Sequence, residues 1–212
     1  MDGVPSSEAK VFSDVLPACP VVALPAGVSR LGRSLSVPSL IVIERGVITV
    51  CNAPAHGSRL VLLDLGPGAL TPAPRAEDAV RALVDSCLTV VPGAVYGRLM
   101  ALPAFSRVVV ERLEATLRKA ELAIECVAGT RSLEARLRQK LLQLAGEYGR
   151  VGKTGIWIDV PLTHELLAAM TGARRESVTR ALAGLVKSGF LVREGRSYRL
   201  LGCDAATLRQ RR

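Results

Sequence analysis

The sequence predicts an α+β fold in which a strand-rich N-terminal part is followed by a long helix and by a basic C-terminal part of helices and short strands. Short apolar runs broken by Gly and Pro continue to about residue 91, which is typical of a small sandwich or barrel. Residues 1–129 carry twelve Lys/Arg and twelve Asp/Glu, whereas residues 130–212 carry sixteen against seven and so hold the whole formal charge of +9. A neutral half joined to a basic half indicates one module that binds a polyanion and another with a different role.

The bulk properties exclude several classes of protein. With 212 residues, 49% of them hydrophobic, the chain is long enough to bury a core. No apolar run approaches the roughly 20 residues that span a bilayer, and the first residues lack the basic-then-apolar order of a secretory signal. We therefore expect a cytoplasmic protein without a membrane segment. The five cysteines lie far apart, with no Cys-x-x-Cys pair and no histidine at zinc spacing, so we expect thiols and no metal site.

The strand-rich part begins after residues 1–20, which show little periodicity and predict a loosely held arm. Its clearest strands are Ser39–Glu44 and Val47–Cys51, separated by Arg45-Gly46. Because Gly supplies the positive φ of a tight turn, these two runs predict a hairpin. Further strands are expected at 59–65 and at 79–91, the latter interrupted near Asp85-Ser86.

Helical periodicity follows in a short segment, 93–102, and in a long one, Ala104–Ala128. Apolar residues recur along the long segment in steps of three and four, at Val110, Leu113, Leu117, Ala120, Ile124 and Val127. Such a narrow heptad stripe favours a partner helix, which a second copy of the chain would supply. A helix packed on its own domain is the alternative, because the stripe is shorter than most coiled coils.

The basic part contains an ordered series of elements. Ser132 is a candidate N-cap for a helix that starts at Leu133, Gly149–Gly155 is expected to be a loop, and Ile156–Val160 reads as a strand. A helix capped by Thr163 then leads through a turn at Gly172 into a second helix. Two strand-like runs, 189–193 and 197–201, complete the series and predict a hairpin.

The second of these helices has two chemically distinct faces. Val178, Leu182 and Leu185 form an apolar face, while arginines and Glu176 lie opposite it near the helix start. An arginine can bond O6 and N7 of guanine together, and a carboxylate can accept from N4 of cytosine. The series therefore predicts a winged helix-turn-helix that binds DNA, with phosphates contacted by Thr163 and by wing arginines. The candidate DNA-binding residues are Thr163, Arg174, Arg175, Glu176, Ser177, Thr179, Arg180 and Arg196, and Arg193 and Arg199 of the wing are also available to phosphates.

Residues Trp157–Leu201 resemble the winged helix of the cyclic AMP receptor protein / fumarate-nitrate reductase regulator (CRP/FNR) family. The resemblance rests on Leu162-Thr-x-Glu-Leu-x-Ala-x-x-Thr-Gly and on Arg175-Glu-Ser-Val-Thr-Arg180, and the run Glu44-Arg-Gly-Val-Ile-Thr-Val resembles the family's β-roll hairpin. It implies that Arg175, Glu176 and Arg180 read a TGTGA-like half-site of a pseudo-palindrome as a homodimer. It also implies RNA polymerase as a partner if the protein is an activator.

This resemblance implies a division of the chain into four parts and a function in transcription regulation. We expect an arm at 1–20, a β-roll of the cyclic-nucleotide-binding (jelly-roll) type at 21–103, a dimerisation helix with a hinge at 104–129, and a winged helix-turn-helix domain at 130–212.

The family's cyclic-nucleotide cassette is degenerate in this sequence. Family members that bind cyclic nucleotides carry Gly-Glu-Leu followed by Arg-Ser/Thr-Ala. The stretch Gly66–Asp78 has no Gly-Glu pair and no hydroxyl residue after Arg75, and Pro72 and Pro74 remove two backbone donors. We therefore do not expect cyclic AMP to be the effector, and the sequence leaves the cofactor unknown.

Other ligands and activities have weaker support. A haem- or other small-ligand-sensing regulator is an alternative, with His56 as a possible ligand, whereas Cys19 alone does not provide an iron–sulfur site. A non-specific architectural DNA-binding protein is a second alternative, although phosphate binding would gain nothing from Glu176. Cys87 and Cys126 lie in periodic apolar segments, which favours core packing over a thiol hydrolase, so we expect no enzyme activity.

Overall fold

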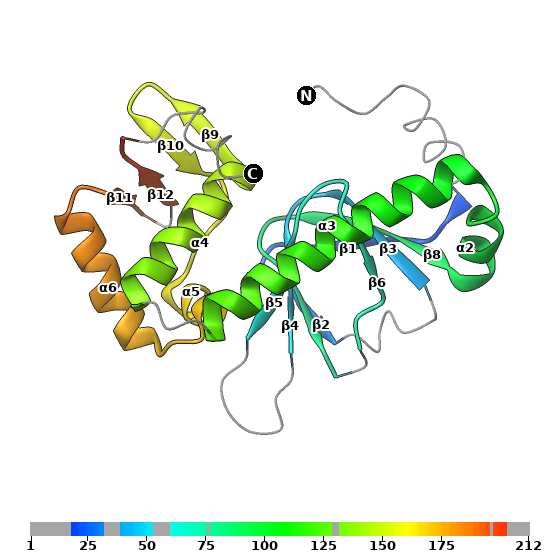
Figure 1. Cartoon of the computed structure of the whole chain (residues 1–212), viewed down its shortest axis with the longest axis horizontal. Helices are drawn as coiled ribbons and strands as arrows, with labels where there is room; N and C mark the ends of the chain where they lie inside the picture. The colour runs from blue at the N-terminus through cyan, green and yellow to red at the C-terminus, as the bar shows by residue number, and fades with distance from the viewer. Residues whose placement is uncertain are drawn as a thin grey trace. The chain divides into compact units, whose positions relative to one another are not determined.

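The computed structural model describes residues 18–31, 39–52, 60–75, 77–128, 132–195 and 197–202. The chain forms two compact units. The boundary between them falls inside the long helix at 103–128, between Glu121 and Leu122. Figure 1 shows strands in the first unit and a mixture of helices and short strands in the second. None of the helices in the described part has the length and hydropathy of a membrane span.

The first unit is built from two four-stranded sheets. One sheet has the order β1-β8-β3-β6 and the other has the order β2-β7-β4-β5. Every connection between consecutive strands crosses from one sheet to the other, except the one from β4 to β5. This arrangement is a double-sheet jelly roll. The strands are β1 (Val21–Leu24), β2 (Ser29–Leu31), β3 (Ser39–Arg45), β4 (Ile48–Cys51), β5 (Val61–Leu65), β6 (Leu70–Pro72), β7 (Ala79–Ala82) and β8 (Ser86–Pro92).

The predicted hairpin between β3 and β4 is wrong. β3 pairs with β8 and β6, whereas β4 pairs with β7, so the two runs belong to different sheets. The reason lies in burial: Leu40 to Ile43 are all buried, as a strand covered on both faces requires, whereas a half-exposed hairpin would alternate. Gly46 still adopts a positive φ of 84°, and a Cβ there would lie 2.6 Å from the Asp85 carbonyl oxygen.

Side chains from both sheets fill the interior of the jelly roll. Ile41 and Ile43 of β3 lie in one buried cluster with residues of the opposite sheet, and the cluster comprises Leu24, Ile41, Ile43, Ile48, Val50, Leu65, Val80, Ala82 and Leu88. A second cluster lies on the other side of β3, where Leu40 and Val42 meet Phe105 and Val109. The latter two belong to α3 (Pro103–Ala128), which follows the short helix α2 (Gly93–Leu99).

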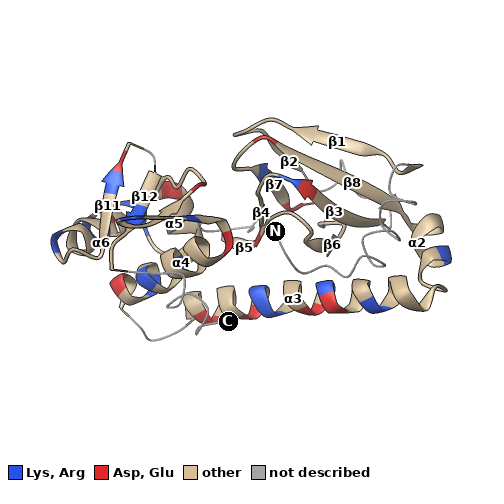
Figure 2. Ribbon diagram, turned by 90° about the horizontal axis from the view of Figure 1, so that it is seen from above, with Lys and Arg blue, Asp and Glu red and all other residues tan. Residues whose placement is uncertain are grey.

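The predicted stripe of α3 is divided between two environments. Leu113 is partly buried and packs against the second cluster, so it stabilises the jelly roll. Val110, Leu117 and Ile124 are exposed to 48%, 60% and 61% and form an apolar row spaced by seven residues. Charged residues of both signs flank the row along the helix (Figure 2).

In its described residues, the second unit contains the C-terminal end of α3, three further helices and a four-stranded sheet of order β11-β12-β10-β9. Its elements are α4 (Leu133–Tyr148), β9 (Gly149–Gly152), β10 (Gly155–Ile158), α5 (His164–Thr171), α6 (Arg175–Lys187), β11 (Leu191–Glu194) and β12 (Ser197–Leu200). Ser132 caps α4, as predicted, by accepting a bond from the Ala135 amide at 3.3 Å. The predicted loop at 149–155 is instead a hairpin with β10, and its exposed Gly-Arg-Val-Gly strand carries no apolar alternation that sequence could reveal.

Candidate DNA-binding surface

The turn between α5 and α6 is set by local backbone chemistry. Thr163 accepts a hydrogen bond from the Leu166 amide at 3.1 Å and so caps α5. Gly172 ends α5 with φ 62° and ψ 36°, a left-handed conformation that glycine adopts without steric cost. A Cβ at Gly172 would lie 2.7 Å from Cγ1 of Val127, at the end of α3, so the close approach also requires glycine.

Buried apolar side chains fix the two helices against α4. Leu167 and Met170 of α5 and Val178 and Leu185 of α6 are at most 1% exposed. They share the interior of this unit with Leu137, Leu141 and Leu144 of α4. Arg136 of α4 strengthens the junction, because its Nη1 donates to the carbonyl oxygen of Thr171 at 2.8 Å. Packing against α4 therefore fixes the position of the outer face of this helix pair within the unit.

The outer face of α6 brings together most of the predicted DNA-binding residues. Arg174, the N-cap position of α6, is exposed and makes no side-chain cap bond. Arg175, Glu176, Thr179 and Arg180 are also exposed and line one concave surface of about 550 Å³. Ser177 lies between this face and the core and is half-buried. Arg196 lies outside the described residues.

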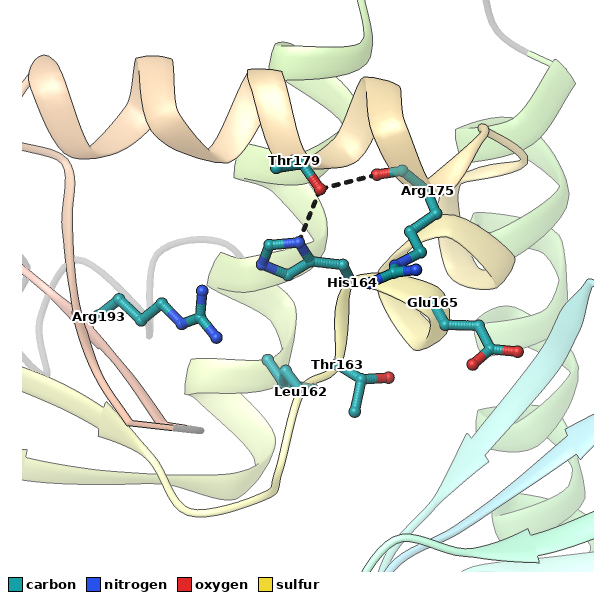
Figure 3. Close-up of a pocket in the computed structure, with 7 residues that line it drawn as sticks. All are labelled: Leu162, Thr163, His164, Glu165, Arg175, Thr179 and Arg193. Carbon is teal, nitrogen blue, oxygen red and sulfur yellow. Dashed lines mark hydrogen bonds between the residues drawn. The ribbon is translucent and has the colours of Figure 1, made fainter.

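A second concave surface, of about 620 Å³, adjoins the first and shares Arg175 and Thr179 with it. Its lining comes from α5 and the two residues before it, from α6 and from β11, and comprises Leu162, Thr163, His164, Glu165, Arg175, Thr179 and Arg193 (Figure 3). The Nδ1 atom of His164 lies 2.8 Å from the Thr179 hydroxyl oxygen. No local sequence pattern indicates this contact, because it joins residues 15 positions apart that only the turn brings together.

The electrostatic environment of His164 is cationic. Partial burial and the nearby charges of Arg193 and Arg175 hold the pKa of the imidazole below its usual value. Arg193 is exposed on the wing strand β11, and its Nε donates to the Gly195 carbonyl oxygen at 3.1 Å. A surface that gathers arginines beside a concavity attracts anions.

The other described wing arginine is engaged within the protein. Arg199 of β12 bonds Glu194 at 3.1 Å, contacts the Thr154 hydroxyl, and stacks over the Trp157 ring with 4.9 Å to its centroid. The guanidinium of Arg199 therefore has partners within the protein, and its contact with phosphates stays a prediction. The cross-strand register pairs Trp157 with Arg199, and no signal local to either residue reveals it.

The degenerate cassette lies between β5 and β7 of the jelly roll and is held by α3. Nη1 of Arg112 donates to the Gly68 carbonyl oxygen at 2.8 Å, and the Thr116 hydroxyl donates to the Leu70 carbonyl oxygen at 2.6 Å. Gly68 has a φ of 77°, and a Cβ there would lie 2.7 Å from Arg112 Nη1. The Arg75 amide donates to Asp78. Within the described residues, no three His, Cys, Asp or Glu side chains gather as metal ligands. His56 lies outside them.

Comparison with known proteins assigns the second unit to a family. Residues 135–211 match the family model described as a Crp-like helix-turn-helix domain. The global nitrogen regulator of Synechococcus elongatus is 33% identical over 90 residues, which is 42% of this chain and 40% of that protein. That alignment therefore spans less than half of either protein.

Two further similarities extend over most of the chain. A protein of Mycobacterium tuberculosis named CRP-like cAMP-activated global transcriptional regulator is 25% identical over 179 residues, 81% of this chain and 80% of that protein. The structure of a CooA variant from Carboxydothermus hydrogenoformans superimposes with a TM-score of 0.73 at 22% identity, covering 95% and 93% of the two chains, a likeness of fold. The predicted α+β architecture is confirmed. Residues 135–211 carry a Crp-like helix-turn-helix domain, and over most of its length the chain is similar to a regulator named CRP-like.

Proposed function

We propose that this regulator binds a pseudo-palindromic, TGTGA-like DNA site as a homodimer, with α6 as the recognition helix of each protomer. The observation that carries the proposal is the exposed row of Arg175, Glu176 and Arg180, opposite the buried Val178 and Leu185. A helix supported in this way can enter the major groove with its first turns against the base edges.

The chemistry of the row favours sequence reading over general attraction to DNA. Arg175 and Arg180 each offer a guanidinium fork for O6 and N7 of guanine, and Glu176 offers an acceptor for N4 of cytosine. A carboxylate at this position repels phosphates, so a non-specific architectural protein would gain nothing from it. Thr163, Arg174, Ser177, Thr179 and Arg196 are the proposed supporting contacts, with the phosphates as their targets.

The proposed dimer uses the apolar row of α3. Val110, Leu117 and Ile124 are about half or more exposed in the single chain and repeat at the heptad spacing. Two such helices side by side would cover both rows and give one dimer two recognition helices. A regulator of this kind works where the DNA is, in the cytoplasm, and would contact RNA polymerase if it activates.

We propose that cyclic AMP does not control the protein. The space between the two sheets is filled by aliphatic side chains, and the Gly68 carbonyl oxygen is already bonded to Arg112 of α3. Titration calorimetry with cyclic AMP and cyclic GMP should give no heat of binding at micromolar concentrations. Stoichiometric micromolar binding that is lost in Arg75→Ala would overturn this part of the proposal.

Selection from a random duplex pool tests the DNA-binding proposal. The wild-type protein should enrich a pseudo-palindrome with half-sites about one helical turn apart, roughly 34–36 Å. Arg196→Ala should weaken binding to all sequences alike and lower the salt slope by about one unit per protomer. A pool that stays unenriched while the protein still binds DNA would indicate an architectural protein instead.

A further inference from the structure

His164 lies beside the proposed base-reading residues of α6 but has no role in reading bases. It lies in the first turn of α5 and is half-buried. Its ring lies between Thr179 of α6 and Arg193 of the wing (Figure 3). The concave surface that it lines adjoins the one formed by the proposed base readers, with Arg175 and Thr179 common to both. A duplex docked on α6 would therefore bring its backbone close to this imidazole.

The hydrogen bonds of Thr179 identify which nitrogen of His164 can titrate. The Thr179 hydroxyl has one hydrogen, and it donates that hydrogen to the Arg175 carbonyl oxygen at 3.0 Å. The hydroxyl oxygen can then only accept from Nδ1 of His164, 2.8 Å away, so Nδ1 carries a proton in the neutral ring. Nε2 is left as the atom that gains a proton, and the Thr179 contact is the same in both charge states.

The charged groups around the ring indicate what would protonate Nε2. Burial and the positive charges of Arg193 of β11 and Arg175 of α6 lower the pKa of the imidazole. Glu165 of α5 is the carboxylate among the lining residues, and its oxygens lie on the far side of the site from Arg193 (Figure 3). Cations that converge without an anion between them make a site that an incoming phosphate would complete.

We propose that His164 and Arg193 together bind a backbone phosphate of the DNA, and that this phosphate is bound with uptake of a proton on Nε2 of His164. The inference rests on the proposed DNA binding. In the free protein the imidazole is neutral near pH 7; beside a bound phosphate its charged form gains a partner and its pKa rises. Because the complex then holds more protons than its separate components, affinity must increase as pH falls between the two pKa values.

The size of the effect follows from linkage. Uptake of one proton per protomer changes the affinity by up to about tenfold per pH unit, and by up to about a hundredfold for a dimer with two such sites. The sequence makes the assignment tractable, because His164 and His56 are its only histidines. Few other side chains change charge between about pH 5.5 and 7.5.

The test measures the dissociation constant of the selected palindrome by fluorescence anisotropy across this pH range at constant ionic strength. Wild type and His56→Asn should bind progressively more tightly as pH falls. His164→Asn, whose amide can still donate to Thr179 but cannot gain a proton, should lose the slope while still binding at pH 7.5. Arg193→Gln should weaken binding at all these pH values.

Two outcomes would overturn the inference and leave the proposed function standing: specific binding without a pH slope in wild type, or an unchanged slope in His164→Asn. A protein that binds no DNA sequence preferentially at any pH would instead refute the proposed function itself. An NMR titration of the His164 ring provides a second readout, because its pKa should be below the usual value of the free side chain without DNA and should rise when the palindrome is added.

Discussion

Replacing Leu117 and Ile124 together by glutamate should convert the proposed dimer into monomers. Full burial of a leucine or isoleucine side chain is worth about 1.5–3 kcal/mol. These two side chains are 60% and 61% exposed in the single chain, so covering them contributes roughly 1–2 kcal/mol each. Two protomers contribute four such side chains, or about 4–7 kcal/mol in all, before the like charges of the introduced carboxylates are counted.

A loss of this size weakens dimerisation about a thousandfold or more, since each 1.4 kcal/mol is a factor of ten. Sedimentation velocity over a concentration series measures it directly. Leu122→Glu is the matched control, because Leu122 is also an exposed leucine of α3, at 43%, but lies off the row that contains Leu117 and Ile124. The reasoning is refuted if the double variant dimerises with wild-type affinity, or if Leu122→Glu disrupts the dimer equally.

Two further substitutions test the support of the candidate surface by thermal unfolding. Thr163→Ala removes the cap of α5 and should lower the free energy of unfolding by about 1 kcal/mol, or the melting temperature by roughly 2–4 °C for a chain of this size. Thr163→Ser should retain most of that stability. Equal effects of the two substitutions would contradict the capping role. Gly172→Ala should destabilise the protein by about 1–2 kcal/mol or more, because φ is 62° and the new Cβ meets Val127. Gly146→Ala within α4 is the control and should be neutral or stabilising, because a Cβ there has nothing within 4 Å. The Gly172 account fails if the two glycine variants unfold alike.

The parts of the fold that sequence could predict are those specified by neighbouring residues. The cap at Thr163, the cap at Ser132 and the turn at Gly172 each depend on a few consecutive positions, and the structure has all three. The apolar face of α6 follows from a spacing of three and four residues in the same way. The succession of a strand-rich part, helices and a C-terminal pair of strands could be predicted because most of these elements leave their own periodicity in the chain.

The parts that could not be predicted depend on partners distant in sequence. The Gly46 turn resembles a hairpin locally, but the continuous burial of β3 between the inner cluster and α3 directs the two flanking strands into different sheets. Strand β9 is fixed by its pairing with β10 rather than by its own composition. The contacts of Arg199 with Trp157 and Glu194 follow from strand pairing and cannot be predicted from its place in the wing. The contact of His164 with Thr179 depends in the same way on the turn that joins α5 to α6.

The most direct test of sequence reading by α6 is a double-mutant cycle between Arg180 and one base pair. Dissociation constants are measured for wild type and Arg180→Ala on the selected palindrome, and on the same palindrome with one guanine per half-site replaced in turn. Wild type should lose about 1–3 kcal/mol per half-site when the guanine that Arg180 bonds is changed, and Arg180→Ala should bind both sequences equally weakly. If Arg180→Ala discriminates at every position as strongly as wild type does, the exposed face of α6 does not read the DNA and the account is wrong.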